Sequence, residues 1–380
     1  MRSKGEWSDA TYKSRVSEVE EKGAGRATFE GEERARQGKA LDPLVDPSKY
    51  TDQNKRGSNT LLVPEGDEFV APFGVAMPVQ TDTDTTGSMG NNVDIVFQVL
   101  PKVQNLLIQG ENAVLKRYHT QIATGIVQDR VDRYPYLRTM FEPDNEVERQ
   151  MGLLVPNRAG GDATEDYQLG LFMAAYLTKL SINDYGLKGY YCVVGDERGR
   201  DKLDARVLEQ VFGSDVLERA FGSKSAKALP STSEVASELV KNWHAFYLQV
   251  NNNSYATEWW AELFGKDHVV KLPRTEDLAE VQAVIIGLTE GVLDLQSAVD
   301  FLGGSKSDRG KSARIIEAVS GIPIGLQASY PNFNKIPLAG ARFKNRDDIW
   351  PIGTSVPKKG KTRPSSEGKK SDTKGKDWKI

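Results

Sequence analysis

One loop of the sequence places an acidic side chain and two hydroxyls at alternate positions: Asp84, Thr86 and Ser88. An apolar strand pattern precedes the loop and a helical pattern follows it. Gly87 allows a tight turn, so the two hydroxyls point back toward the Asp84 carboxylate. All the atoms offered are hard oxygens, which favours Mg²⁺ or Mn²⁺ over Zn²⁺. A turn that only caps the following helix, with Ser88 as the N-cap, is the plainer alternative.

Residues 84–90 read Asp-Thr-Thr-Gly-Ser-Met-Gly. This run resembles the metal-ion-dependent adhesion site (MIDAS) of the von Willebrand factor A (VWA) family, in the form found in bacterial and phage proteins. The resemblance implies a doubly wound sheet with a divalent ion at the ends of its strands, where such folds place ligands. It also implies that the metal binds a carboxylate of a partner and performs no chemistry.

Two later segments match the same family. Asp162 follows a pair of glycines just before an apolar helix, where the family brings another metal residue, and Thr164 is the alternative if the register differs by two. Asp196 ends an apolar strand, where the family places its last acidic metal residue. The usual Thr-Asp-Gly is Gly-Asp-Glu here, so the Thr is missing. The resemblance thus implies a metal site made of Asp84, Thr86, Ser88, Asp162 and Asp196, some of them acting through water.

Alternating strand and helix patterns predict an α/β fold with a doubly wound, mostly parallel sheet over residues 68–290. Pro101 should kink or split the helix that follows the Asp84 loop. A strongly apolar helix is expected over residues 167–182. Further strands are expected at 120–127, 136–141, 189–195, 245–250 and 268–272.

Outside the domain, residues 1–65 carry alternating charges and few large apolar side chains, which predicts a flexible arm. Residues 291–356 are expected to form an extension packed back on the domain. The Lys-rich stretch 357–380 is typical of a disordered basic tail, whose commonest role is solvation. Weak binding of this tail to nucleic acid or to an acidic partner is the more specific alternative.

The overall composition narrows the class of protein. The formal charge is only −3, which gives no global reason to expect nucleic-acid or membrane binding. A single cysteine, Cys192, excludes a disulfide framework and suits a reducing cytoplasm. The first residues lack the apolar core of a secretion signal, and no apolar run is long enough to span a bilayer. A cytoplasmic location is therefore expected.

A rival interpretation uses the same loop. Asp82-x-Asp84-x-Thr86 also matches the Asp-x-Asp-x-Thr signature of haloacid dehalogenase-type phosphatases, in which the first Asp is the nucleophile. Asp196 and Asp201 would then hold Mg²⁺, with Lys179 or Lys188 as the phosphate-neutralising residue. This alternative leaves the glycine pair before Asp162 without a role.

The sequence-based prediction is a protein-interaction module that is not an enzyme. A divalent ion, Mg²⁺ or otherwise Mn²⁺ or Ca²⁺, would bind an Asp or Glu of a partner protein. The resemblance implies a role as an adaptor, beside an AAA+ ATPase or within a multi-protein assembly. A purely structural component of a larger assembly is a third possibility, and it does not require the metal.

Overall fold

The computed structural model describes residues 17, 29–50, 56–109, 113–158, 164–223, 228–303 and 309–349 of the 380. Two sequence-based predictions, the metal residue Asp162 and the basic tail 357–380, fall outside these ranges. No helix within the described ranges is both long and apolar enough to cross a membrane.

Six strands form the central sheet, in the order β5-β4-β3-β6-β7-β8. Only β5 runs antiparallel to its neighbour, and the other pairings are parallel. The predicted α/β class with a mostly parallel, doubly wound sheet is therefore confirmed. The strands are β3 (Ala76–Asp84), β4 (His119–Val127), β5 (Tyr136–Arg138), β6 (Gly189–Gly195), β7 (Trp243–Gln249) and β8 (Val269–Lys271).

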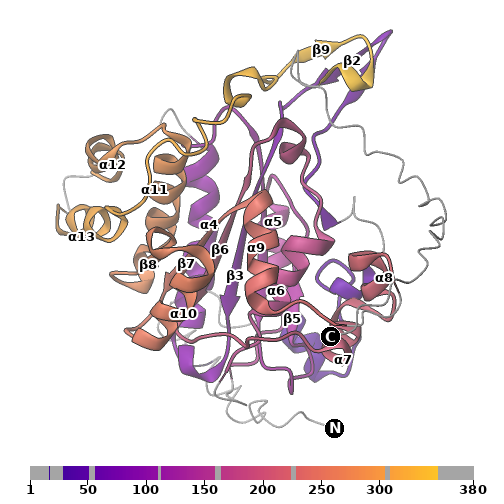
Figure 1. Cartoon of the computed structure of the whole chain (residues 1–380), viewed down its shortest axis with the longest axis vertical. Helices are drawn as coiled ribbons and strands as arrows, with labels where there is room; N and C mark the ends of the chain where they lie inside the picture. The colour runs from indigo at the N-terminus through magenta and orange to yellow at the C-terminus, as the bar shows by residue number, and fades with distance from the viewer. Residues whose placement is uncertain are drawn as a thin grey trace, which may run out of the picture.

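Helices cover both faces of this sheet. Figure 1 shows α4 packed beside α11 on one face, and α6 beside α9 on the other. All nine residues of β3 and all seven of β6 are buried, as expected for central strands that are covered on both sides. The helices are α4 (Asn92–Ile108), α5 (Glu146–Met151), α6 (Gln168–Phe172), α7 (Ala205–Phe212), α8 (Val216–Phe221), α9 (Thr232–Asn242), α10 (Ser254–Phe264) and α11 (Leu278–Glu290).

Segments from both ends of the domain form a second, smaller sheet. It has the order β1-β2-β9 and is antiparallel, with β1 (Val63–Glu65) and β2 (Glu68–Ala71) paired to β9 (Ala341–Phe343). This sheet projects from one end of the molecule (Figure 1). Before β9, helices α12 (Leu295–Leu302) and α13 (Arg309–Val319) pack on α11.

The predicted flexible arm is wrong for the described part of residues 1–65. Phe29 is fully buried, with its ring centroid 5.0 Å from that of Phe97. Helix α2 (Glu30–Arg36) follows, and the Tyr50 hydroxyl donates to the Arg138 carbonyl at 2.7 Å. Apolar contacts, this hydrogen bond and the buried ion pair between Glu32 and Arg158 at 2.6 Å hold this charged segment on the domain.

Two helices differ from their predicted form. Helix α4 runs unbroken through Pro101, because its buried face, which includes Val96 and Leu100, packs on the domain. The predicted helix over 167–182 is instead α6 followed by a π-helical turn, η3 (Met173–Leu177). The short 3₁₀ segments are η1 (Pro47–Lys49), η2 (Gly87–Met89), η4 (Ser181–Tyr185), η5 (Lys266–His268), η6 (Thr275–Asp277), η7 (Phe333–Lys335) and η8 (Arg346–Ile349).

Candidate metal site

The candidate site lies where the strand order of the sheet reverses. From β3 the chain continues to β4 on one side, and later returns to β6 on the other side. Asp84 is the last residue of β3, and Asp196 directly follows β6. Because β3 and β6 are parallel neighbours, both carboxylates stand at the same edge of the sheet. This crevice at the carboxyl ends of the strands is where open α/β sheets bind ligands.

The Asp84 loop folds back on its own carboxylate. Thr86 donates to Asp84 Oδ1 twice, from its backbone nitrogen at 2.8 Å and from its hydroxyl at 2.7 Å. Gly90 ends the turn with a φ of 51°, a conformation that favours glycine. The loop therefore presents the Thr86 hydroxyl beside the carboxylate, as the sequence predicts.

Ser88 links this loop to the neighbouring strand. Its hydroxyl lies 3.3 Å from Thr86 Oγ1 and donates to Asp196 Oδ1 at 2.9 Å. The second oxygen of Asp196 accepts from Asn251 Nδ2 at 3.3 Å. Thr86 and Ser88, from the loop of Asp84, and Asp196, from the end of β6, thus form one connected group with Asp84.

Glu165 joins the same group. Thr86 Oγ1 lies 3.2 Å from Glu165 Oε1, and among the described residues Glu165 Oε2 is buried without a hydrogen-bond partner. A backbone bridge between Glu165 and Gly199 holds it beside the turn after β6. Its neighbour Asp166 points elsewhere and binds Arg130 at 2.9 Å. Only the tertiary pairing separates the roles of these two adjacent acids.

Tyr167 completes the surroundings of Asp84. Its hydroxyl donates to Asp84 Oδ2 at 2.5 Å, and its ring packs edge-on against Trp260 with centroids 5.2 Å apart. The hydroxyl also occupies the space beside Gly195, since a Cβ built there would lie 2.0 Å from it. A glycine at the end of β6 is therefore needed for Tyr167 to reach the carboxylate.

The carboxyl groups of the site have raised pKa values, so they hold their protons more tightly than exposed acids do. Burial raises the pKa of Asp84 to about 7, and the nearby Asp196 charge acts in the same direction. Burial and the charges of Asp84 and Asp129 raise the pKa of Glu165 to about 10. Burial also raises the pKa of Asp196. A bound divalent ion would stabilise carboxylates gathered in this way.

The donors present fit a hard divalent cation. Hydroxyls of Thr86 and Ser88 stand between the carboxylates of Asp84 and Asp196, and every donor is an oxygen. Among the described residues, no three Asp, Glu, His or Cys side chains form a metal-holding cluster by themselves. The two hydroxyls would therefore be essential members of the ligand set, and the buried Oε2 of Glu165 is a further oxygen without a hydrogen-bond donor.

Two predicted metal residues remain to be placed. Asp162 falls outside the described residues, so its prediction is unchanged. Thr164 is half-buried in the bend just before Glu165. Among the described residues of this segment, the carboxylate of Glu165 is the group that contacts Thr86.

Asp82 has no access to a substrate. It lies two residues before Asp84 in β3 and is fully buried. Its carboxylate accepts hydrogen bonds from Tyr191 at 2.6 Å and from Tyr136 at 3.1 Å. Gly125 and Gly170 lie so close that a Cβ on either would fall within 2.3 Å of its oxygens. Asp201, the second acid of the phosphatase interpretation, accepts from the indole of Trp259 at 3.0 Å. This geometry counts against Asp82 as a nucleophile.

No family model matches this sequence, and no curated protein matches it. Among solved structures, proximal thread matrix protein 1 from the mussel byssus is similar at 12% identity and a TM-score of 0.35, over 58% of this chain and 48% of that one. A pilus adhesin, SpaC from Lactobacillus rhamnosus GG, is similar at 15% identity and a TM-score of 0.38, over 61% and 34%. A further structure of the mussel protein carries a zinc-occupied MIDAS motif, at 11% identity and a TM-score of 0.33.

The chain thus spans about half of the mussel protein and a third of the adhesin. At these identities and TM-scores, the similarities assign no activity to this chain. The sheet order and the position of the Asp84 loop are consistent with a VWA-like fold.

Proposed function

We propose that the chain is a divalent-cation-dependent protein-interaction module. The observation that carries this proposal is the position of Ser88, whose hydroxyl lies between Thr86 and Asp196. Segments more than a hundred residues apart in the chain thereby place their oxygens around one point. Asp84, Thr86, Ser88 and Asp196 would hold the ion with Asp162, and Glu165 would supply a further carboxylate.

The protein residues would each have a distinct task in this module. Asp84 is fixed by Tyr167 on one oxygen and by Thr86 on the other, so it orients the loop. Gly87 and Ser88 are exposed, so the loop presents one side to a partner. When bound, the ion would accept an Asp or Glu carboxylate of that partner as a further ligand.

The partner is a protein that presents an acidic residue, and the module itself performs no catalysis. An AAA+ ATPase or another member of a multi-protein assembly is the class of partner that the family resemblance implies. A purely structural role would not need the metal, so it would survive the loss of Asp84.

Calorimetric titration of Mn²⁺ and Mg²⁺ tests the metal site. We expect binding to the wild type and loss of binding in Asp84→Ala, with weaker binding in Ser88→Ala. Ser237→Ala is the matched control, because that exposed hydroxyl caps a carbonyl within α9 and should leave metal affinity unchanged. Equal affinity in the wild type and Asp84→Ala would refute the proposed site.

The open ligand position can be tested without knowing the partner. Mn²⁺ bound to the protein enhances water-proton relaxation, and acetate should reduce this enhancement by displacing a metal-bound water. Acetamide at the same concentration is the uncharged control. A phosphatase assay on the same samples tests the phosphohydrolase alternative. Turnover in the wild type that is lost in Asp82→Asn would overturn the proposal in favour of a phosphohydrolase.

A further inference from the structure

The side chain of Arg56 is a buried cation without a hydrogen-bond partner among the described residues. The residue is 1% exposed, and its Nε, Nη1 and Nη2 atoms are all buried without an acceptor in that part of the chain. An unpaired guanidinium in a protein interior loses its hydration and gains nothing in return, so such groups are rare. A buried unsatisfied group in a native fold calls for an explanation, and a bound anion is one.

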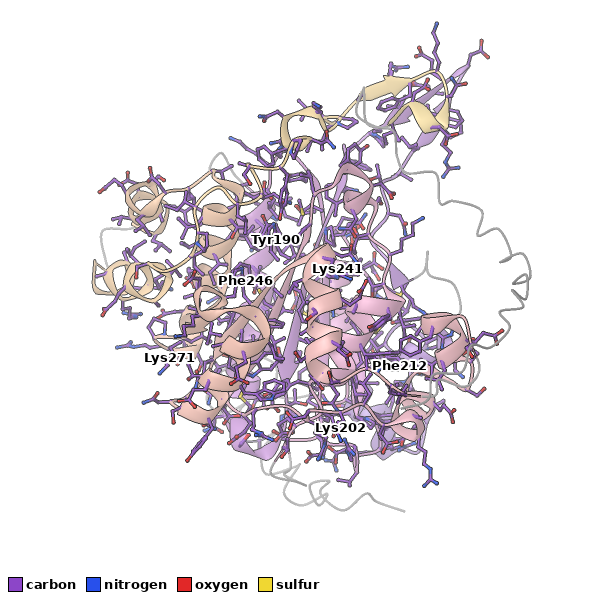
Figure 2. The ribbon with its side chains drawn as sticks, in the orientation of Figure 1. Tyr190, Lys202, Phe212, Lys241, Phe246 and Lys271 are labelled. Carbon is purple, nitrogen blue, oxygen red and sulfur yellow. The ribbon has the colours of Figure 1, made fainter. Side chains whose placement is uncertain are left out.

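Two further arginine side chains lie near Arg56. Arg138 from β5 is fully buried, and its Nη2 donates to the Arg56 carbonyl at 2.5 Å. Arg219 from α8 donates to the carbonyl of Phe212, which Figure 2 labels on the side of the molecule that carries α7 and α8. The Nη1 atom of Arg219 is also buried without a hydrogen bond.

One described acidic group, Asp215, forms an ion pair with Arg219 at 2.9 Å. Its side chain is 54% exposed, so this ion pair lies at the protein surface. Burial and the charges of Arg219 and Arg138 lower the pKa of Arg56 to about 10, and the charge of Asp215 acts in the opposite direction. The three arginines come from separate segments of the chain, and the carboxylate that pairs with Arg219 is largely exposed.

We propose that Arg56, Arg138 and Arg219 form a binding site for a small oxyanion of the phosphate type. Arg56 would be the main ligand, because a guanidinium presents its donors in a planar fork that matches two oxygens of a phosphate. Arg219 Nη1 would supply a further donor, and Arg138 would hold the Arg56 backbone in place. The site is separate from the metal site and does not depend on the proposed function.

The anion would fasten the N-terminal segment to the domain. Arg56 follows the segment that carries η1, and η1 packs against both α7 and β5. Figure 1 shows this part of the chain beside α7 and α8. An anion shared by Arg56 and Arg219 would thus join the N-terminal segment to α8 and offset the repulsion between their charges.

Thermal unfolding of the full chain in inorganic phosphate tests this proposal. We expect phosphate at about 100 times its dissociation constant to raise the wild-type Tm by about 5 °C, from the mass-action stabilisation of the folded state. Arg56→Met should lose this response. In phosphate-free buffer it should melt at or above the wild-type temperature, because it removes an unpaired buried charge.

The controls separate specific binding from general salt effects. Phosphate stabilises many proteins by exclusion from their surfaces, so the shift must be compared with Arg206→Met, which removes an exposed arginine of α7. Sodium chloride at matched ionic strength and sodium acetate distinguish a tetrahedral oxyanion from any anion and from a carboxylate. Equal shifts in the wild type and Arg56→Met would overturn the proposal. If Arg56→Met does not fold, calorimetric titration of phosphate into the wild type decides it, and absence of binding at millimolar phosphate is the negative result.

Discussion

The Tyr167 hydroxyl donates to Asp84 Oδ2 at 2.5 Å, which ties the segment before α6 to the last residue of β3. The contact exists because Gly195, at the end of the adjacent strand, leaves the necessary space. The aromatic ring, the glycine and the carboxylate come from three separate segments. Together they fix the orientation of the central acid of the candidate site before any ion binds.

Gly195→Ala should damage both the fold and the site. The new methyl group would lie 2.0 Å from the Tyr167 hydroxyl, so the tyrosine must move away from Asp84. We expect a loss of about 1 to 3 kcal/mol in the free energy of unfolding, together with weaker Mn²⁺ binding. Urea denaturation and calorimetry measure the two effects. Gly321→Ala is the control, since a Cβ there meets no atom within 4 Å, and a similar loss in both variants would contradict the steric argument.

Glu165→Gln should separate metal affinity from stability. Glutamine has the shape of the protonated acid, so we expect the free energy of unfolding in EDTA to change by less than about 1 kcal/mol. The variant lacks the carboxylate charge that would attract the ion, so its Mn²⁺ dissociation constant should rise about tenfold or more. An unchanged affinity would show that Glu165 lies near the ion without contributing to its binding. Calorimetry in parallel with urea denaturation provides both numbers.

Glu290 should make stability depend on pH. Tyr190 and Tyr118 donate to its two oxygens at 2.6 and 3.0 Å, but burial outweighs them and raises its pKa from 4.5 to about 7. Because the folded-state pKa is the higher one, the folded protein holds the proton more tightly than the unfolded chain does. The contribution to stability is complete below about pH 4.5 and is lost as pH rises through 7.

Glu290→Gln therefore has a specific expected outcome. The variant should lose less stability than the wild type between pH 5 and about pH 8, because its amide cannot ionise. Urea denaturation at a series of pH values measures the difference, and only the wild-type minus variant curve is used, since other groups titrate in both proteins. Parallel curves would mean that the carboxyl ionises as easily in the folded chain as in the unfolded one.

Phe29→Ala tests the attachment of the N-terminal segment. Phe29 is fully buried against Phe97, so its truncation should cost about 3 to 5 kcal/mol of unfolding free energy. Leu61→Ala is the control, because Leu61 is 45% exposed and should change stability by no more than about 0.5 kcal/mol. If both variants unfold at the wild-type urea concentration, the segment does not contribute to the stability of the domain.

The sequence by itself determined the features that depend on neighbouring residues. The turn that brings Thr86 back to Asp84 is local, because hydroxyls two residues from an acid in a glycine-containing turn have few other positions. The strand β6 is equally readable, since a run of seven apolar or small residues suits a strand covered on both faces. From two such strands and the rule that ligands bind at their carboxyl ends, the meeting of Asp84 with Asp196 follows.

Only the tertiary structure decided which polar residues share an environment. Asp82 and Asp84 lie two residues apart and match the same motif, but tyrosines from β5 and β6 enclose Asp82 while Asp84 faces the crevice. Glu165 and Asp166 are adjacent acids with different partners. Glu165 forms a backbone bridge with Gly199 and contacts Thr86, whereas Asp166 forms an ion pair with Arg130.

The N-terminal segment shows the same limit. Its charge pattern predicts a solvated arm, and nothing near Phe29 or Arg56 in the sequence reveals that both are buried. Phe97 lies 68 residues after its partner Phe29, and Arg138 lies 82 residues after its partner Arg56. The free energy of such contacts depends on surfaces that exist only after the chain has folded, so composition underestimates them.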